Sequence, residues 1–150
     1  MLRDAIKAAT TDAMKARDTA RLGALRLIAA ALKNKDIELR TGTAPADDDV
    51  TVADVLMKMA KQRRESIEMY DKGGRAELAD AERAELAVIE EFLPQQMDDA
   101  EALAAIRAVV AEIGATSVKD MGRVMAAVKE RFAGKIDMSK ASGLVKAALG

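Results

Sequence analysis

The side chains with the clearest chemical use are cationic and lie in the last third of the chain. Residues 107–150 hold eight basic and four acidic residues, although the 150-residue chain as a whole has a net charge of −1. Ammonium and guanidinium groups bind phosphate oxygens through charge and hydrogen bonds. An excess of this size is also found on ordinary solvated helices. The candidate surface for a phosphate backbone comprises Lys119, Gly122, Arg123, Lys129, Lys135, Lys140 and Lys146.

The central part of this candidate surface is predicted to be one helix. A helical spacing of 100° per residue puts Lys119 and Arg123 on the solvent side. Gly122 and Lys129 share a flank, and a glycine there lets another backbone come close. That backbone is either a neighbouring helix, which we favour, or a phosphate chain. Base stacking is not expected, because Phe132 is the single aromatic residue of this region and lies on the core face.

A second candidate site combines one arginine with two glutamates. Arg63 interrupts the apolar face of one predicted helix, and Glu82 and Glu85 interrupt the face of the next. We favour a structural ion pair that holds the two helices in register. The alternative is a pair of carboxylates for acid–base chemistry beside an anion-binding arginine. No nucleophile is expected nearby.

Residue types limit the other kinds of chemistry. The chain has no cysteine and no histidine, which excludes disulfides, thiol nucleophiles, imidazole bases and zinc fingers. The stretch TGTAPADDDV from Thr41 is expected to be an exposed loop that ends in helix-start acids. Its three adjacent aspartates are a weak candidate for a cation site, because neighbouring side chains diverge. We therefore expect no metal and no cofactor.

The beginning of the chain, MLRDAIKAATTDAMK, lacks the uninterrupted apolar run of a signal peptide or a membrane span. We therefore expect a protein that is neither exported nor inserted in a membrane. The absence of cysteine fits a reducing compartment, and the predicted location is cytoplasmic.

Apolar residues three and four positions apart predict helices along most of the chain. The expected fold class is all-α, with a four-helix N-terminal unit. The core positions expected in its helices are Leu2, Ile6, Ala9 and Ala13; Leu22, Leu25, Ala29, Leu32 and Leu39; Val52, Val55, Leu56, Met59, Ile67 and Tyr70; and Leu78, Leu86, Ile89, Phe92 and Leu93. Asp18 is expected to cap the second helix, and Thr51 with Asp54 to form a capping box for the third.

A small C-terminal domain of three helices is expected after Pro94. Its expected core positions are Leu103, Ile106, Val110 and Ile113; Met121, Val124, Met125, Val128 and Phe132; and Leu144, Val145 and Leu149. The expected caps are Asp98 with Glu101 and Ser117 with Asp120, and the expected stop is Gly114. The predicted domains are residues 1–94 and 97–150, connected by an exposed joint around Gln95 and Gln96.

Five segments, taken in order, resemble the GatB/YqeY family. They are DAMKARDTARLGALRLIAAALKNKDIE, KQRRESIEMYDKGGRAELADAE, EEFLPQQM, KDMGRVMAAVKERFAGKID and LVKAAL. The succession of an Arg-Arg-Glu-Ser-Ile-Glu helix, a Phe-Leu-Pro joint and a Lys-Asp-Met-Gly helix is specific as a set, and the match covers nearly the whole chain. The chain looks like the stand-alone YqeY-like members, which are small bacterial proteins. One departure is Met138, where many relatives have a glycine.

The resemblance implies a four-helix unit followed by a three-helix unit. It also implies kinship with the GatB tail domain of the glutamine-dependent tRNA amidotransferase, which contacts tRNA while other parts of the enzyme do the chemistry. The family carries the label of a carbon–nitrogen ligase with glutamine as amido-N-donor. This sequence has neither a Gly-rich phosphate loop nor a Ser-Lys amidase constellation, so we expect no catalysis by the chain alone.

Three functions of different classes remain. The preferred one is a tRNA-binding or tRNA-enzyme accessory module. The second is a protein-interaction module that docks on an amidotransferase or an aminoacyl-tRNA synthetase without touching RNA. The third is a free-standing enzyme, which the lack of catalytic groups disfavours.

Overall fold

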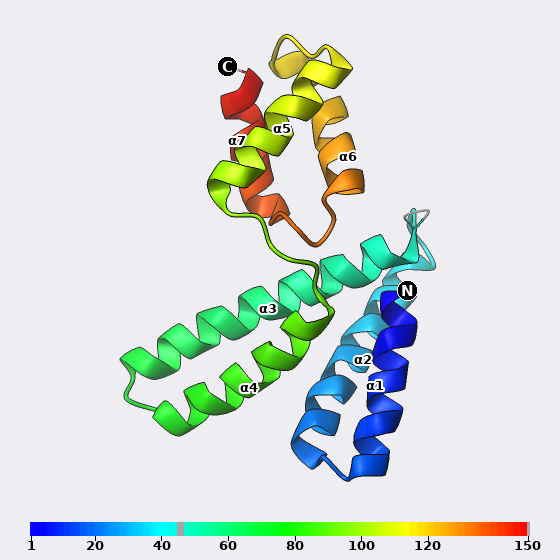
Figure 1. The fold of residues 1–150 in the computed structure, drawn as a ribbon, viewed down its shortest axis with the longest axis vertical. Helices are drawn as coiled ribbons and strands as arrows, with labels where there is room; N and C mark the ends of the chain where they lie inside the picture. Colours follow the sequence, from blue (N-terminus) through cyan, green and yellow to red (C-terminus); the bar gives the residue numbers. More distant parts are fainter. Residues whose placement is uncertain (45–46, 150) are drawn as a thin grey trace. The chain divides into compact units, whose positions relative to one another are not determined.

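The computed structural model describes residues 1–44 and 47–149, and every regular element in these ranges is helical (Figure 1). The elements are α1 (Leu2–Ala16), α2 (Thr19–Leu39), α3 (Asp48–Lys72), α4 (Ala76–Phe92), α5 (Asp99–Ile113), the 3₁₀ turn η1 (Val118–Asp120), α6 (Met121–Arg131) and α7 (Met138–Leu149). The predicted all-α fold is confirmed. No helix of these described ranges is both long enough and apolar enough to cross a bilayer.

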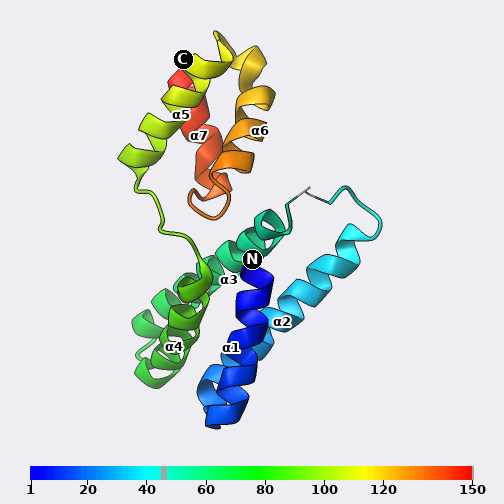
Figure 2. The ribbon, with the colours of Figure 1, turned by 45° about the vertical axis from the view of Figure 1, so that its right-hand side comes forward.

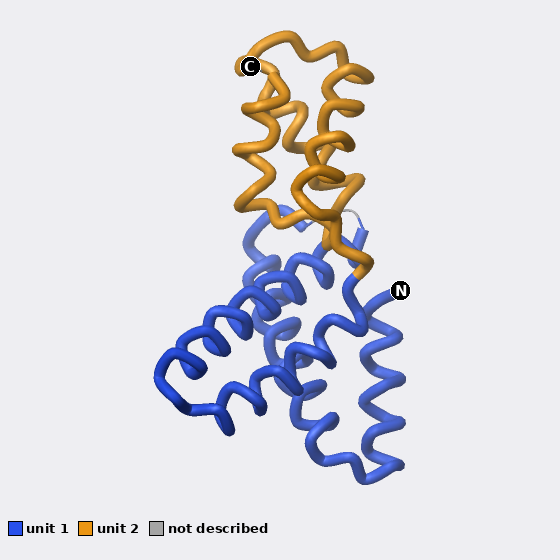
Figure 3. Tube along the Cα trace, turned by 60° about the vertical axis from the view of Figure 1, so that its left-hand side comes forward, with its two compact units in different colours: residues 1–93 blue, residues 94–150 orange. Residues whose placement is uncertain are grey.

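The chain divides into two compact units, Met1–Leu93 and Pro94–Gly150 (Figure 3). Unit 1 contains α1 to α4, and unit 2 contains α5 to α7. The largest fully buried side chains of unit 1 are Leu25, Ile28, Val52, Leu56 and Ile89. Those of unit 2 are Ile106, Val109, Val124, Val128 and Val145. Each unit therefore has its own hydrophobic core.

Unit 1 is built from two pairs of neighbouring helices. Figures 1 and 2 show α1 beside α2 and α3 beside α4, with a short connection inside each pair. The buried residues of α3 all lie between Thr51 and Ala60, and none of residues 61–78 is buried. The far part of the α3–α4 pair is therefore stabilised mainly by contacts between these two helices rather than by the shared core.

Several predicted helix ends are confirmed. The carboxylate of Asp18 accepts the backbone N–H of Arg21 at 3.1 Å and caps α2. Asp98 accepts the N–H of Glu101 at 2.8 Å and caps α5. Gly114 ends α5 with a φ of 74°, a left-handed conformation that costs little for glycine.

The predicted capping box of the third helix is wrong. Asp47 caps α3 by accepting the N–H of Asp49 at 2.9 Å, and Thr51 lies inside the helix with 5% of its surface exposed. An aspartate at the cap followed by two acids in the first turn suits the positive end of the helix dipole, so the helix starts earlier. In the predicted loop from Thr41, residues 45–46 lie outside the described residues.

Two predicted core positions are wrong by one residue. Ala29 is exposed and Ile28 is fully buried, because the inner face of α2 follows Leu25, Ile28 and Leu32. In α4, Leu78 is 36% exposed while Ala79 is buried. Other predicted positions of these helices, such as Leu25, Leu32 and Ile89, are buried, so the error is limited to one position in each helix.

Candidate nucleic-acid interface

The candidate phosphate surface is organised around the start of α6. Ser117 Oγ accepts the N–H of Lys119 at 3.3 Å, and Asp120 Oδ2 accepts the N–H of Thr116 at 3.1 Å. The predicted cap therefore forms, although it closes the turn η1 rather than α6 itself. Val124 and Val128 are fully buried and fix the rotation of α6, so its other side faces solvent.

Lys119 and Arg123 are both exposed, as their helical positions predict. Arg123 is not an isolated cation, because its Nη2 donates to Asp120 Oδ1 at 2.8 Å. The N–H of Thr116, followed by this guanidinium, holds the pKa of the Asp120 carboxyl below its usual value. Phosphate binding by Arg123 would therefore compete with an existing pair, whereas no carboxylate of the described residues lies within 4 Å of the Lys119 ammonium.

Gly122 is exposed on α6, and a Cβ built on it meets no atom of the described residues within 4 Å. The favoured prediction, close packing of a neighbouring helix against this glycine, is therefore wrong. The same holds for Gly143 on α7, which is also exposed and open. The space in front of Gly122 is available to a molecule from outside.

The remaining predicted cations come from separate segments of unit 2. Lys129 is exposed in the last turn of α6, Lys135 is partly buried between α6 and α7, and Lys140 and Lys146 are exposed on α7. The Lys140 ammonium lies 3.9 Å from Asp99, which directs it toward α5. Within the described ranges, Lys129, Lys135 and Lys146 have no carboxylate within 4 Å.

Two further cations of unit 2 were not among the predicted residues. Arg107 is exposed on α5 with no carboxylate of the described chain within 4 Å. Because Arg107 directly follows the buried Ile106, helical periodicity would have predicted that its side chain faces solvent. Arg131 makes two hydrogen bonds to Glu112, at 2.5 and 3.0 Å, and lowers the pKa of that carboxyl. Arg131 therefore joins α6 to α5.

The predicted joint is attached to unit 2 by hydrogen bonds. The N–H of Met97 donates to the carbonyl of Lys135 at 3.0 Å, and the side chain of Gln96 donates to the carbonyls of Pro94 and Gly134. These bonds hold the segment before α5 against the turn between α6 and α7. The backbone around Lys135 is thereby fixed within the unit.

The second candidate site is formed by α3 and α4. Arg63 Nε donates to Glu85 Oε2 at 2.7 Å and lies 3.2 Å from Glu82 Oε2, which accepts no hydrogen bond from the described residues. The three side chains are only 17–32% exposed. The guanidinium is already occupied by two carboxylates, so this geometry suits a structural link between helices better than the binding of an anionic substrate.

The three adjacent aspartates at the start of α3 each have a different role. Asp47 caps the helix, Asp48 pairs with Arg3, and Asp49 accepts the N–H of Leu2 at 2.9 Å. Their oxygens do not converge. In residues 1–44 and 47–149, no group of three or more aspartate, glutamate, histidine or cysteine residues has the geometry to hold a metal ion.

The described structure is that of a small all-α protein with two helical units, the second of which exposes several cations. A family model described as "Yqey-like protein" matches residues 3–149. The chain therefore belongs to the YqeY-like family.

Curated proteins with similar sequences come from yeasts and carry the name "Altered inheritance of mitochondria protein 41, mitochondrial". The protein of Eremothecium gossypii is 33% identical over 81 residues, which cover 54% of this chain and 43% of the relative. Those of Lachancea thermotolerans and Saccharomyces cerevisiae are 31% identical over 83 residues, which cover 55% of this chain and 43% of each relative. The match spans less than half the length of these relatives.

Proposed function

We propose that this chain is a tRNA-binding accessory module whose unit 2 contacts the phosphate backbone. The observation that carries the proposal is the set of exposed lysines around an open glycine. Lys119 and Lys129 extend from the same helical segment as Gly122, and neither ammonium has a carboxylate of the described chain within 4 Å. A phosphate chain can approach the helix at the glycine and be held by the lysines on either side.

The mode of recognition follows from the side chains of the surface. Lysines contact phosphates without reading bases, and Phe132 packs against the core of unit 2, so it does not offer a face for stacking. The module is therefore expected to recognise the shape and charge of a folded RNA rather than its sequence.

The choice of tRNA rests on the resemblance of KDMGRVMAAVKERFAGKID to the GatB tail of the tRNA amidotransferase. On this proposal the chain brings tRNA to an enzyme, such as an amidotransferase or an aminoacyl-tRNA synthetase, and does no amidation itself. The proposed location is the cytoplasm. The curated relatives are named as mitochondrial, so the compartment of this chain is tested separately, by fractionation of cells that express it.

The second candidate function, docking on a protein partner without RNA, is favoured by one observation. Val118 is 54% exposed in η1, next to Lys119. An exposed apolar side chain beside a cation suits a protein surface better than a phosphate backbone. On this alternative, the partner co-purifies with the chain after ribonuclease treatment.

The test is a titration of labelled bulk tRNA with the full chain, followed by fluorescence anisotropy at two salt concentrations. Each phosphate contact contributes a slope of about −0.7 to −0.9 to the dependence of log K on log salt. Lys119→Glu/Lys129→Glu is expected to weaken binding by about tenfold or more and to reduce the slope by about two. Arg123 is left intact, because its substitution would also disturb Asp120.

The matched control is Lys15→Glu/Lys61→Glu, which makes the same change in net charge on exposed residues of unit 1. It is expected to retain most of the affinity. If the two double variants lose affinity equally, binding depends on net charge alone and the proposed surface is wrong. If the unmodified chain shows no binding at low salt, the RNA function is wrong and protein docking becomes the better account.

A further inference from the structure

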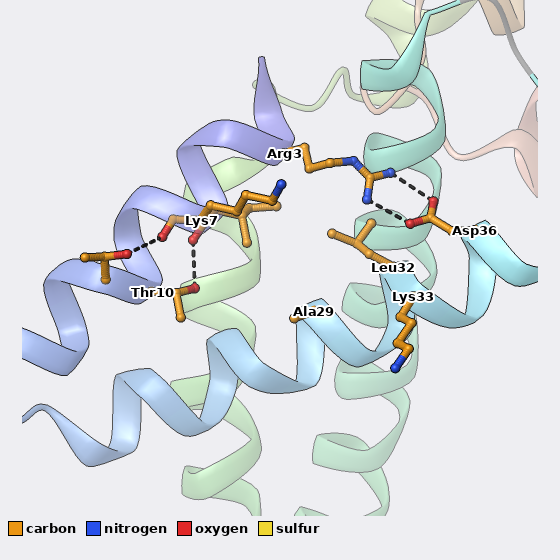
Figure 4. A pocket seen from close by; sticks show the side chains of 9 residues that line it. Arg3, Lys7, Thr10, Ala29, Leu32, Lys33 and Asp36 are labelled. Carbon is orange, nitrogen blue, oxygen red and sulfur yellow. Dashed lines mark hydrogen bonds and ion pairs between the residues drawn. The ribbon is translucent and has the colours of Figure 1, made fainter.

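A pocket of about 500 Å³ lies between α1 and α2 of unit 1 (Figure 4). Its lining follows one ridge of each helix, from Arg3 to Thr11 on α1 and from Ala29 to Asp36 on α2, at spacings of three and four residues. At 1.5 Å per residue, the ridge on α1 is about 12 Å long. The volume is in the range of pockets that hold small molecules, about 300–1,000 Å³.

The interior of the pocket is apolar. Ile6 and Leu32, which are only 3% and 4% exposed, belong to the core of unit 1 and also border the pocket. Ala29, on the next turn of α2, has only a methyl group, and a larger side chain at this position would occupy part of the space. Ala29 is therefore an exposed residue of the pocket rather than the core residue expected from the sequence.

Two lysines supply most of the hydrogen-bond donors that remain available to a ligand in the pocket. The hydroxyls of Thr10 and Thr11 donate to carbonyls of their own helix, at 2.8 and 3.2 Å (Figure 4). Arg3 uses four of its five N–H groups in bonds to Asp36 and Asp48. Lys7 and Lys33, on facing helices, have no carboxylate within 4 Å among residues 1–44 and 47–149.

The local charge favours a singly charged ligand. Arg3, Lys7 and Lys33 are positive, Asp36 lines the pocket, and Asp48 completes the Arg3 pair. The hydrogen bond from Arg3 lowers the pKa of the Asp48 carboxyl, and the Lys7 ammonium adds to this effect. These charges leave an excess of one positive charge, which a monoanion neutralises, whereas the second charge of a dianion would lose hydration without a counter-charge of its own.

We propose that the pocket between α1 and α2 binds an amphiphilic monocarboxylate. The apolar part covers Ile6, Ala29 and Leu32, and the carboxylate accepts hydrogen bonds from the ammonium groups of Lys7 and Lys33. In Figure 4 the side chains of Lys7 and Lys33 point in different directions, so both must rotate for their charged ends to meet one carboxylate, which exposed lysines can do. This site is in unit 1 and is independent of the proposed RNA surface in unit 2.

The probe is sodium octanoate, titrated into the ¹⁵N-labelled full chain while amide chemical shifts are recorded. The expected result is a saturable change confined to residues of α1 and α2 around the pocket, with a dissociation constant on the order of 1 mM. Neutral 1-octanol is expected to bind at least about fivefold more weakly, because it lacks the charge. Octyl phosphate, a dianion near pH 8, is expected to bind more weakly than octanoate.

Two pairs of variants locate the site. Ala29→Leu fills the pocket and should abolish binding, whereas Ala30→Leu changes an exposed neighbour outside the lining and should not. Lys7→Gln/Lys33→Gln should weaken octanoate binding by about tenfold and remove its advantage over octanol, whereas Lys15→Gln/Lys61→Gln should have no effect. Circular dichroism establishes that each variant is folded, and tRNA binding by Lys7→Gln/Lys33→Gln should be unchanged.

Three outcomes would overturn the proposal. Equal affinity for octanoate and octanol means that the lysines do not recognise the anion. Tighter binding of octyl phosphate than of octanoate means that the head group is not a carboxylate. Unchanged octanoate binding in folded Ala29→Leu, or shifts that spread over both units without saturation, means that the pocket is not the site.

Discussion

Basic side chains are used differently in the two units. In the described part of unit 1, five arginines form ion pairs with a carboxylate of another helix: Arg3, Arg21, Arg63, Arg64 and Arg83. In the described part of unit 2, Arg131 makes the one such pair shorter than 3.5 Å, and Lys140 makes a longer one at 3.9 Å. Most of the other cations of unit 2 face solvent.

The difference reflects how each unit is packed. Within residues 61–88 of the α3–α4 pair, Ala79 is the one buried residue, so arginines and glutamates take part in holding the helices together. The three helices of unit 2 share one core, and most of its described cations do not pair with another helix. A basic residue of unit 2 is therefore a better candidate for ligand binding than one of unit 1, unless it borders a pocket as Lys7 and Lys33 do.

The largest expected effect tests whether the two cores are independent. Leu56→Ala in unit 1 and Ile106→Ala in unit 2 each remove a fully buried side chain, which costs about 2–5 kcal/mol. Each variant should lose hydrogen-exchange protection in its own unit only. Loss of protection in both units from either substitution would show a shared core and would weaken the comparison.

The next effect concerns the ion pairs themselves. Arg63→Ala leaves Glu82 and Glu85 without the guanidinium that faces them and should destabilise unit 1 by about 1–2 kcal/mol, less than for a fully buried pair. Arg123→Ala in unit 2 breaks an exposed pair and should cost less than about 1 kcal/mol. Urea unfolding provides both values.

The control for Arg63 is Arg63→Met/Glu82→Gln/Glu85→Gln, which removes the charges together. It should recover most of the stability lost in Arg63→Ala, since no carboxylate is left opposite an apolar side chain. Equal losses from Arg63→Ala and Arg123→Ala would mean that pairing in unit 1 has no special structural role.

A smaller effect is expected at Gly122, where one substitution should change stability and tRNA affinity in opposite directions. Gly122→Ala should stabilise α6 by about 0.5–1 kcal/mol, because the new methyl meets no atom of the described residues within 4 Å and alanine favours the helix. The same methyl stands where the phosphate chain is proposed to pass, so tRNA affinity should fall by a few-fold. Gly143→Ala, an equally open glycine on α7, should raise the melting temperature without changing affinity; a fall in affinity with both would point to a general effect of rigidity.

The smallest expected effect is a decrease in the stability of unit 1 at low pH. The hydrogen bond from Arg3 holds the pKa of Asp48 below its usual value, so this pair adds stability above about pH 4 and loses it as the pH falls through the lowered pKa. Because the Asp48 side chain is 57% exposed, the contribution is below about 1 kcal/mol. Arg3→Gln should flatten the decline of unit 1 stability between pH 5 and 2, measured by urea unfolding. Asp99→Asn in unit 2 is the control, and an equally steep decline in Arg3→Gln would contradict the assignment.

The helices and several of their ends could be predicted from the sequence, because both depend on interactions within a few residues. Apolar spacing, the caps Asp18 and Asp98 and the stop at Gly114 each act within a few residues. The start of α3 was missed because two capping signals compete there, and Asp47 comes first along the chain. The rotation of α2, which buries Ile28 and exposes Ala29, depends on which helices pack against it.

The candidate site was predictable only in part. Helical spacing placed Lys119 and Arg123 on the solvent side, but the pair between Arg123 and Asp120 depends on the geometry of the turn η1. The open space at Gly122 is a property of the packed unit and has no local signal. The pocket beside Lys7 and Lys33 requires the register of α1 against α2, which the bonds between Arg3 and Asp36 reveal.

Lysine reactivity tests whether Lys119 and Lys129, which have no carboxylate of the described residues within 4 Å, bind RNA phosphate. The full chain is reductively methylated with and without bulk tRNA, and modification of each lysine is measured by mass spectrometry. We predict strong protection of Lys119 and Lys129, and little change at Lys15 and Lys61 of unit 1. Equal reactivity of Lys119 and Lys129 in the presence of saturating tRNA, or protection confined to unit 1, would contradict the account.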